Sequence, residues 1–189
     1  MHTYIYMVRH GESPKDGNER TRGLTEKGKL DSCRITELLH GEGIEVFVSS
    51  PYQRAILTIE ELAQRSGQKV IVFEDLKERI FINGNKRISD EELLPLLNKS
   101  YSNPDFALPG GESNSICQNR AIKVLNKLLE ENKGQKIALG THGAVMALMM
   151  EYYDSKYDLN FLLGTSKPDV YKMEFNRQTL IDVTRLWST

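Results

Sequence analysis

Residues suited to binding an anion stand directly after short apolar runs of this chain. Arg9 and His10 follow the run TYIYMV, and His142 follows KIALGT. Arg54 lies shortly after EVFVSS, and Glu78 lies shortly after KVIVFE. Arginine holds phosphoryl oxygens in a planar fork, and each charge-assisted hydrogen bond contributes on the order of 1.5 to 3 kcal/mol. These residue types therefore predict a phosphoryl-binding site, provided that the fold brings them together.

The apolar runs alternate with helical patterns, and this alternation predicts the fold. It indicates an α/β protein with a mostly parallel sheet of about six strands covered on both faces, a three-layer α/β/α sandwich. We expect strands over residues 3–8, 45–50, 69–74, 136–141, 169–175 and 179–187. The last two are close enough to form a hairpin, which makes one strand antiparallel. Ligands bind outside the carboxyl ends of such strands, so the residues named above should meet at one rim.

Four helices are expected between these strands. Thr25 is suited to cap a helix that ends near residue 39, and Pro51 to begin one that ends near residue 65. A third helix spans about 114–131, and a fourth follows Gly143 with apolar residues all round, so it should be buried. The residues expected on the apolar sides of the first and third helices are Leu30, Cys33, Leu38, Ile116, Ala121, Val124, Leu125 and Leu128.

Residues 80–112 interrupt the alternation. This excursion includes a helix start at Ser89, with Glu92 three positions on, and then the loop SNPDFALPGGE. We expect residues 1–189 to form a single domain in which the excursion covers the substrate. Tyr101 and Phe106 could cover an apolar leaving group or pack on the sheet. Two neighbouring cations of the excursion, Lys86 and Arg87, are more typical of a solvated pair than of contacts to a second anionic group.

The composition limits the classes of partner. The 25 basic and 26 acidic residues give a net charge of -1, which favours neither nucleic acid nor an anionic membrane. No run reaches the roughly 18 apolar residues of a membrane span. We therefore expect a cytoplasmic protein in which Cys33 and Cys117 are reduced core thiols. The pair His40-Gly41 lies at a helix end, where both residues suit a cap, so we expect it to be structural.

Five motifs, taken in order, carry a resemblance to a known family. They are RHGES (9–13), SSPYQRA (49–55), LKER (76–79), PGGES (109–113) and THG (141–143). Together they resemble the histidine phosphatase superfamily, which includes cofactor-dependent phosphoglycerate mutases and many phosphatases. The resemblance extends over nearly the whole chain.

The resemblance implies a role for each matching residue. His10 would be the nucleophile, Glu78 the proton donor to the leaving oxygen, and Arg9, Arg54 and His142 the ligands of the phosphoryl oxygens. Ser13 and Gly143 are expected to contact the substrate as well. The glycines after both histidines, Gly11 and Gly143, should let the backbone approach a ligand closely. No metal or cofactor is expected.

The predicted function is that of a phosphomonoester phosphatase acting on a small phosphorylated substrate. Alternatives are a phosphoglycerate-type mutase and a phospholigand-binding protein without turnover. The chain is shorter than typical mutases of the family, which favours the phosphatase. Two loops depart from the family pattern: Asp16 follows GESPK where relatives often have tryptophan and asparagine, and TRGLT lacks their Asp-x-Pro. An acidic Asp16 would disfavour a highly anionic substrate. The leaving group and the oligomeric state are not determined by the sequence.

Overall fold

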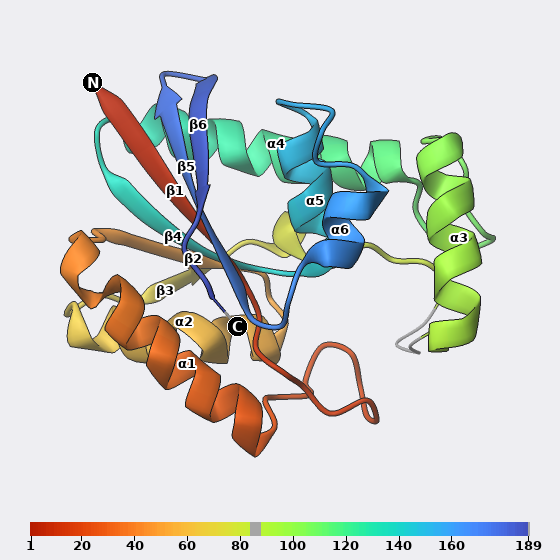
Figure 1. Ribbon diagram of the computed structural model, residues 1–189, viewed down its shortest axis with the longest axis horizontal. Coiled ribbons are helices and arrows are strands. Elements are labelled where there is room, and N and C mark those ends of the chain that lie inside the picture. Colours follow the sequence, from red (N-terminus) through yellow and green to blue (C-terminus); the bar gives the residue numbers. More distant parts are fainter. Residues whose placement is uncertain (84–87, 189) are drawn as a thin grey trace.

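One sheet of six strands forms the centre of the protein (Figure 1). The computed structural model describes residues 1–83 and 88–188. The strands are β1 (His2–Arg9), β2 (Val46–Ser49), β3 (Val70–Val72), β4 (Lys136–Thr141), β5 (Asp169–Asn176) and β6 (Thr179–Arg185). Their order in the sheet is β3-β2-β4-β1-β5-β6. β5 is antiparallel to both of its neighbours, and the other pairings are parallel. The predicted α/β fold and its mostly parallel sheet are confirmed.

The four expected helices all form within the described residues, although the second begins at Gln53, after the N-cap Tyr52, and not at Pro51 as expected. They are α1 (Glu26–Leu39), α2 (Gln53–Arg65), α4 (Asn114–Glu131) and α5 (Gly143–Glu151), and two more are α3 (Asp90–Ser102) and α6 (Leu159–Gly164). Short 3-10 helices cover His40–Glu42 and Glu74–Leu76. The predicted cap Thr25 accepts a hydrogen bond from the amide of Gly28, and Ser89 caps α3 through the amide of Glu92. None of the helices in the described part of the chain is long and apolar enough to span a membrane.

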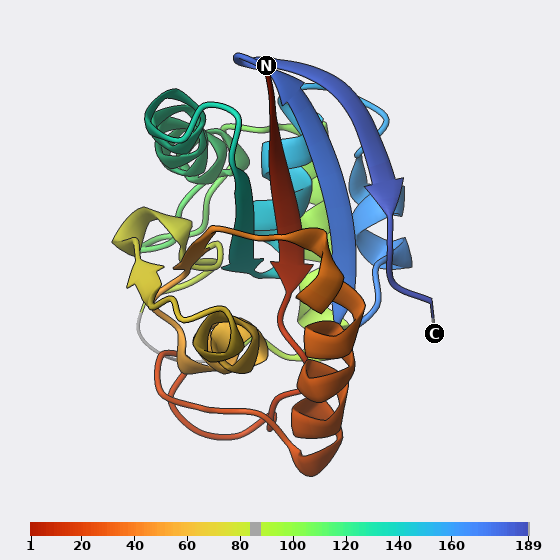
Figure 2. The same ribbon diagram turned by 90° about the vertical axis from the view of Figure 1, so that its left-hand side faces the viewer.

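The two faces of the sheet are covered by different helices. Ile5 and Met7 of β1 pack in a cluster with α4 and α5, whereas Tyr6 and Val8 pack in a second cluster with α1 and α2. Successive side chains of a strand point to opposite faces, so this alternation is the expected one. Figure 1 shows the two helix groups on either side of the sheet, and Figure 2 shows the β5–β6 hairpin beside β1.

The predicted apolar side of α1 is wrong. Leu30 is 68% exposed and Leu38 41% exposed, while Asp31 and Thr36 are among the buried residues. The polar groups on this buried side are satisfied, because Asp31 accepts from Lys27 and Arg34, and Thr36 donates to the carbonyl of Ser32. Hydrogen bonding of this kind removes most of the cost of burying a polar group.

Three further expectations need correction. Cys33 is exposed and lies near Glu61, so only Cys117 is a core thiol, and burial raises the pKa of that thiol. Ile116, in the first turn of α4, is 57% exposed. His40 does end α1, but the left-handed residue is Gly43, with φ of 69°, and not Gly41.

The excursion packs its helix α3 against other helices. Leu97 of α3 shares a small cluster with Ala144 and Ala147 of α5 and Leu162 of α6, and Tyr101 packs at its edge. Tyr101 therefore contacts the core rather than lying free over the site. The predicted pair Lys86 and Arg87 lies outside the described residues.

Candidate active site

The strand ends bring the first predicted residues to one rim. Arg9 at the end of β1 pairs with Thr141 at the end of β4, and Ser49 at the end of β2 pairs with Gly140. The amide of His10 donates to the carbonyl of Thr141 at 3.0 Å, which fixes the backbone of His10 beside β4. The carboxyl ends of three neighbouring parallel strands therefore form the floor of the site.

His10 is held in a single useful orientation. Its side chain is buried, with Nδ1 2.7 Å from the carbonyl oxygen of Gly11 and Nε2 3.2 Å from Nε of Arg54. A carbonyl only accepts, so Nδ1 carries the proton and Nε2 presents its lone pair to Arg54. Burial, and then the charge of Arg54, lower the pKa of His10 well below its ordinary value. His10 is thus a neutral imidazole whose Nε2 carries no proton, which is the form that can attack phosphorus.

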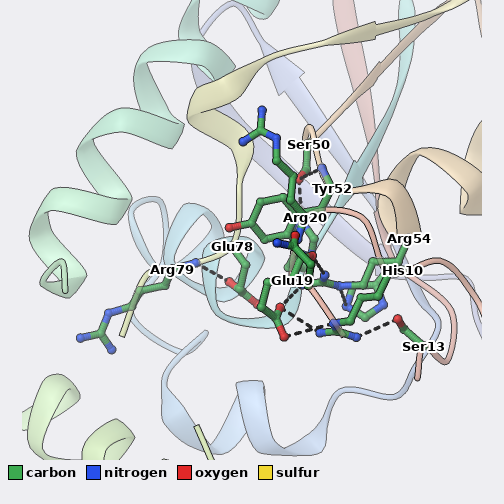
Figure 3. A network of polar contacts seen from close by, with 12 residues as sticks. His10, Ser13, Glu19, Arg20, Ser50, Tyr52, Arg54, Glu78 and Arg79 are labelled. Atoms are coloured by element: carbon green, nitrogen blue, oxygen red, sulfur yellow. Dashed lines mark hydrogen bonds and ion pairs between the residues drawn. The ribbon is translucent and has the colours of Figure 1, made fainter. Parts of the chain in front are cut away.

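Arg54 lies in the first turn of α2 and is fully buried. Its Nη1 donates to the carbonyl of Glu19 at 2.5 Å, and its Nη2 donates to the Glu19 carboxylate at 3.0 Å. The same carboxylate accepts from Arg22. Figure 3 shows the Glu19 carboxylate and the Arg54 guanidinium side by side at His10. The sequence analysis did not identify Glu19 or Arg22 as site residues.

His142 stands next to His10. Their ring centroids are 5.2 Å apart, and the ring of Tyr52 lies 5.0 Å from that of His142. Nε2 of His142 is 2.6 Å from the hydroxyl of Ser50. Burial, and then Arg54, lower the pKa of His142 well below its ordinary value. In the free protein both histidines are therefore neutral.

The guanidinium of Arg9 lies in the space that a side chain at position 143 would occupy. A Cβ added at Gly143 would lie 2.8 Å from Nη2 and 2.9 Å from Cζ of Arg9. On its other side the guanidinium donates to the hydroxyl and the carbonyl of Thr165, in the turn after α6. We expected Gly143 to let the backbone approach a ligand, but in this structure it makes room for the side chain of Arg9. Gly11 instead approaches the backbone of Gly28, whose carbonyl oxygen would lie 3.0 Å from a Cβ at Gly11.

Glu78 lies at the N-terminus of α5. Its carboxylate accepts hydrogen bonds from the amides of Ala144 at 3.2 Å and Val145 at 3.0 Å. These two residues follow His142 closely in the chain. The amide of Arg79 adds a third bond at 2.9 Å. Free N–H groups at a helix start favour a negative group, so this end of α5 holds Glu78 at the rim of the site.

The segment that carries Glu78 is fixed by Arg120 of α4. Arg120 donates to the carbonyl of Glu78 at 3.2 Å and is paired with Glu112 of the PGGES motif. Further bonds from Arg120 reach the carbonyls of Asp75 and Lys77. Glu112 thus acts through Arg120 to position Glu78.

Ser13 is engaged within its own loop. Its hydroxyl donates to the carbonyl of Gly23 at 2.6 Å and accepts from Arg22 at 2.7 Å. A second link, between Arg20 and Glu74, joins this loop to the segment before Glu78. In the free protein Ser13 therefore positions Arg22 rather than presenting a free hydroxyl.

Several buried polar atoms at the rim have no hydrogen-bond partner among the described residues. They include Nε of Arg9, Nδ1 of His142 and Oγ1 of Thr141. Most buried polar atoms in proteins are paired, so these three atoms are available to hydrogen-bond a ligand. An oxyanion supplies the acceptors that Arg9 lacks. The structure thus brings His10, Arg9, Arg54, His142 and Glu78 to one rim of the sheet.

Comparison with known proteins agrees with this geometry. Residues 5–181 match the sequence profile of the histidine phosphatase superfamily (branch 1). The chain belongs to this superfamily. Among similar members, the phosphoglycerate mutase-like protein 4 of Arabidopsis thaliana is 27% identical over 97% of this chain and 79% of its own length. A probable phosphoglycerate mutase of Cronobacter sakazakii is 28% identical over 77% of this chain and 72% of its own length.

Several solved structures share the fold of this chain. A mycobacterial glucosyl-3-phosphoglycerate phosphatase has a TM-score of 0.79 at 17% identity, covering 98% of this chain and 97% of that chain. A phosphoserine phosphatase from Entamoeba histolytica in complex with 3-phosphoglyceric acid has a TM-score of 0.78 at 21% identity, covering 96% and 95%.

Proposed function

We propose that this protein is a phosphomonoester phosphatase that acts through a phosphohistidine on His10. One observation carries the proposal: the buried, proton-free Nε2 of His10 lies 3.2 Å from the guanidinium of Arg54. A nucleophile and a cation that would hold the transferred group are thus already in place. The buried unpaired atoms of Arg9 and His142 support the same assignment.

The first chemical step moves the phosphoryl group to the enzyme. Nε2 of His10 attacks phosphorus in line with the leaving oxygen, the phosphorus–oxygen bond breaks, and Glu78, which must enter this step as the carboxylic acid, gives its proton to that oxygen. Arg9 and Arg54 stabilise the charge on the three equatorial oxygens. Nδ1 of His10 keeps its hydrogen bond to the carbonyl of Gly11 throughout.

The second step returns the enzyme to its starting state. Water attacks phosphorus, Glu78 takes its proton, and the bond from phosphorus to Nε2 breaks to release inorganic phosphate and neutral His10. His142 becomes an imidazolium when the phosphoryl group is present, because a nearby dianion favours the charged ring. Arginine and histidine supply the positive charge, so the proposed reaction needs no metal.

A phosphoglycerate-type mutase is the second candidate, because relatives of this chain are named as mutases or mutase-like. A mutase must protect its phosphohistidine from water. This chain covers nearly the whole length of the two similar phosphatase structures. Those phosphatases therefore have no large segment that this chain lacks. Incubation with 3-phosphoglycerate distinguishes the two: a phosphatase releases phosphate, and a mutase forms 2-phosphoglycerate.

Hydrolysis of p-nitrophenyl phosphate, followed from pH 5 to 8 with EDTA present, tests the proposal. We expect turnover in EDTA, and we expect kcat/KM at pH 5.5 to stay within about threefold of its value at pH 7. A nucleophile with an ordinary histidine pKa near 6.5 would lose about eightfold over that interval by protonation. Because the pKa of His10 is lowered, its protonation is delayed to more acidic pH.

Two results of this experiment would contradict the proposal. Loss of all turnover in EDTA, restored by added metal, would assign the chemistry to a metal. An acid limb centred on pH 6.5 would mean that the nucleophile is not a buried histidine. The pH dependence of unfolding should be measured over the same range. Neutral buried histidines also destabilise the native state as the pH falls below about 6.5, since the unfolded chain then binds more protons.

The Gly143→Ala variant tests whether the guanidinium of Arg9 must lie against Gly143. Its added Cβ overlaps the guanidinium of Arg9, which is the mobile end of a long side chain and can move aside. We expect kcat/KM to fall by roughly 10- to 100-fold, as for small misplacements of catalytic groups, with little change in thermal stability. Gly164→Ala is the matched control, because nothing lies within 4 Å of a Cβ at Gly164. Equal activity of the two variants would show that Arg9 need not occupy this position.

A further inference from the structure

Glu19 places a carboxylate inside the proposed phosphoryl site. Its Oε2 lies 3.0 Å from Nη2 of Arg54 and 2.9 Å from Nη2 of Arg22, so one oxygen bridges two guanidinium groups. The Glu19 side chain is 18% exposed, and those of Arg22 and Arg54 are 11% and 2% exposed. Figure 3 shows this carboxylate among the side chains around His10. An internal anion of this kind in an anion site requires an explanation.

The carboxylate and a bound phosphoryl group would need the same guanidinium. Nε of Arg54 faces Nε2 of His10, while Nη2 of Arg54 is bonded to Glu19. A phosphoryl group on Nε2 of His10 would take its fork of hydrogen bonds from the edge of Arg54 that joins these two nitrogens. Glu19 occupies half of that edge.

The charge state of Glu19 makes the conflict stronger. Burial acts to raise its pKa, but hydrogen bonds and charges of Arg22 and Arg54 outweigh burial and lower it, so Glu19 is ionised. Two anions at one guanidinium repel each other in a site with little water. Glu19 must therefore leave Arg54 when a phosphoryl group binds, and Arg22 can retain it through its other nitrogen, Nε.

We propose that Glu19 competes with the phosphoryl group for Arg54. Its carboxylate binds Arg54 in the free protein, is displaced when the substrate binds, and binds Arg54 again when inorganic phosphate leaves. This inference rests on the proposed function, because it assigns the phosphoryl group to Arg54. The competition multiplies the affinity for phosphate by the fraction of free molecules in which Arg54 is not bonded to Glu19. Its functional consequence is weak product inhibition.

The opposite role is a purely positioning one. If Glu19 serves only to orient Arg54 and Arg22, removal of its charge loosens both cations and weakens phosphate binding. The two roles therefore predict changes of opposite sign in the same measurement.

The test is calorimetric binding of inorganic phosphate and of orthovanadate to wild type and to Glu19→Gln. We expect both anions to bind about tenfold more tightly to the variant, which corresponds to Glu19 holding Arg54 in about nine of ten free molecules. The inhibition constant for phosphate against p-nitrophenyl phosphate should fall by the same factor. The matched control is Glu26→Gln, because Glu26 is an exposed carboxylate paired with Lys29 outside the site.

Unchanged or weaker anion binding by Glu19→Gln would overturn the proposal. Glu19→Asp is the second variant, for use if the glutamine variant is unfolded by circular dichroism. Its carboxylate is one methylene shorter and cannot bridge Arg22 and Arg54 in the same way, so tighter binding is again expected. Binding is measured without turnover, so failure of the phosphatase assay with an intact Glu19 effect would reject the proposed reaction and leave the competition standing.

Discussion

Turnover of p-nitrophenyl phosphate by the His10→Ala variant is expected to fall by roughly 10⁴-fold or more, a loss typical of removing a covalent nucleophile. Nε2 of His10 is the proton-free nitrogen that faces Arg54 within the site. Without it the proposed phosphoenzyme cannot form, although the proposed oxyanion ligands Arg9, Arg54 and His142 are all retained. Phosphate affinity should therefore stay within about tenfold of wild type.

The control for this variant is His40→Ala. His40 also precedes a glycine, but it lies exposed at the end of α1 and away from the strand ends. It should leave turnover unchanged. Rapid quenching in alkali adds a direct readout, because wild type should form a phosphohistidine, which is labile in acid but persists in base, and His10→Ala should not. Turnover that survives in His10→Ala would place the nucleophile elsewhere and reject the mechanism.

For Arg54→Lys we expect kcat/KM to fall by roughly 10²- to 10³-fold, even though the charge is kept. Lysine offers a single ammonium group in place of a planar fork, so it cannot give the phosphoryl group two parallel hydrogen bonds beside His10. The guanidinium of Arg54 uses three nitrogens on its two partners, His10 and Glu19. A preorganised donor of this type is worth about 3 kcal/mol in transition-state stabilisation.

Arg65→Lys is the matched control for Arg54→Lys. Arg65 lies near the end of the same helix α2 and pairs with Glu37 and Glu61 on the surface. Exposed pairs contribute little, so this variant should behave as wild type. Similar activities for the two lysine variants would show that positive charge alone, without the fork, is sufficient in the site.

Much of the site could be predicted because its residues come directly after strands. The sheet fixes where each strand ends, so Arg9, His10 and His142 meet whatever the details of the loops. The helix starts at Gln53 and Gly143 then place Arg54 and the amides that bind Glu78 at the same rim. Position in the chain and the topology rule together were enough for these residues.

The buried side of α1 could be predicted only in part from hydrophobicity. Its buried positions include Asp31, Ser32 and Thr36, whereas Leu30 and Leu38 are exposed. Ile35 and Leu39 share this buried side, but polar residues occupy its other positions and are satisfied by local hydrogen bonds. Tertiary contacts thus override the apolar pattern, which is the only signal available from the sequence.

Glu19 and Arg22 were missed for a different reason. They lie in an irregular loop between β1 and α1, where no periodicity predicts which side chains point inward. Charged residues in such loops are usually solvated, and the motif of the family is interrupted here. The available signal was the excess of charge in NERTR, which follows a nucleophile motif and precedes a capped helix.

The contact between Arg9 and Thr165 joins residues that are 156 positions apart in the chain. β1 is made first by the ribosome, but both of its partners in the sheet, β4 and β5, are made in the last third of the described chain. A nascent chain that already carries the RHGES motif therefore lacks the groups that hold Arg9 in place. Phosphate-binding competence should arise late in synthesis, as a single event, when the final strands dock.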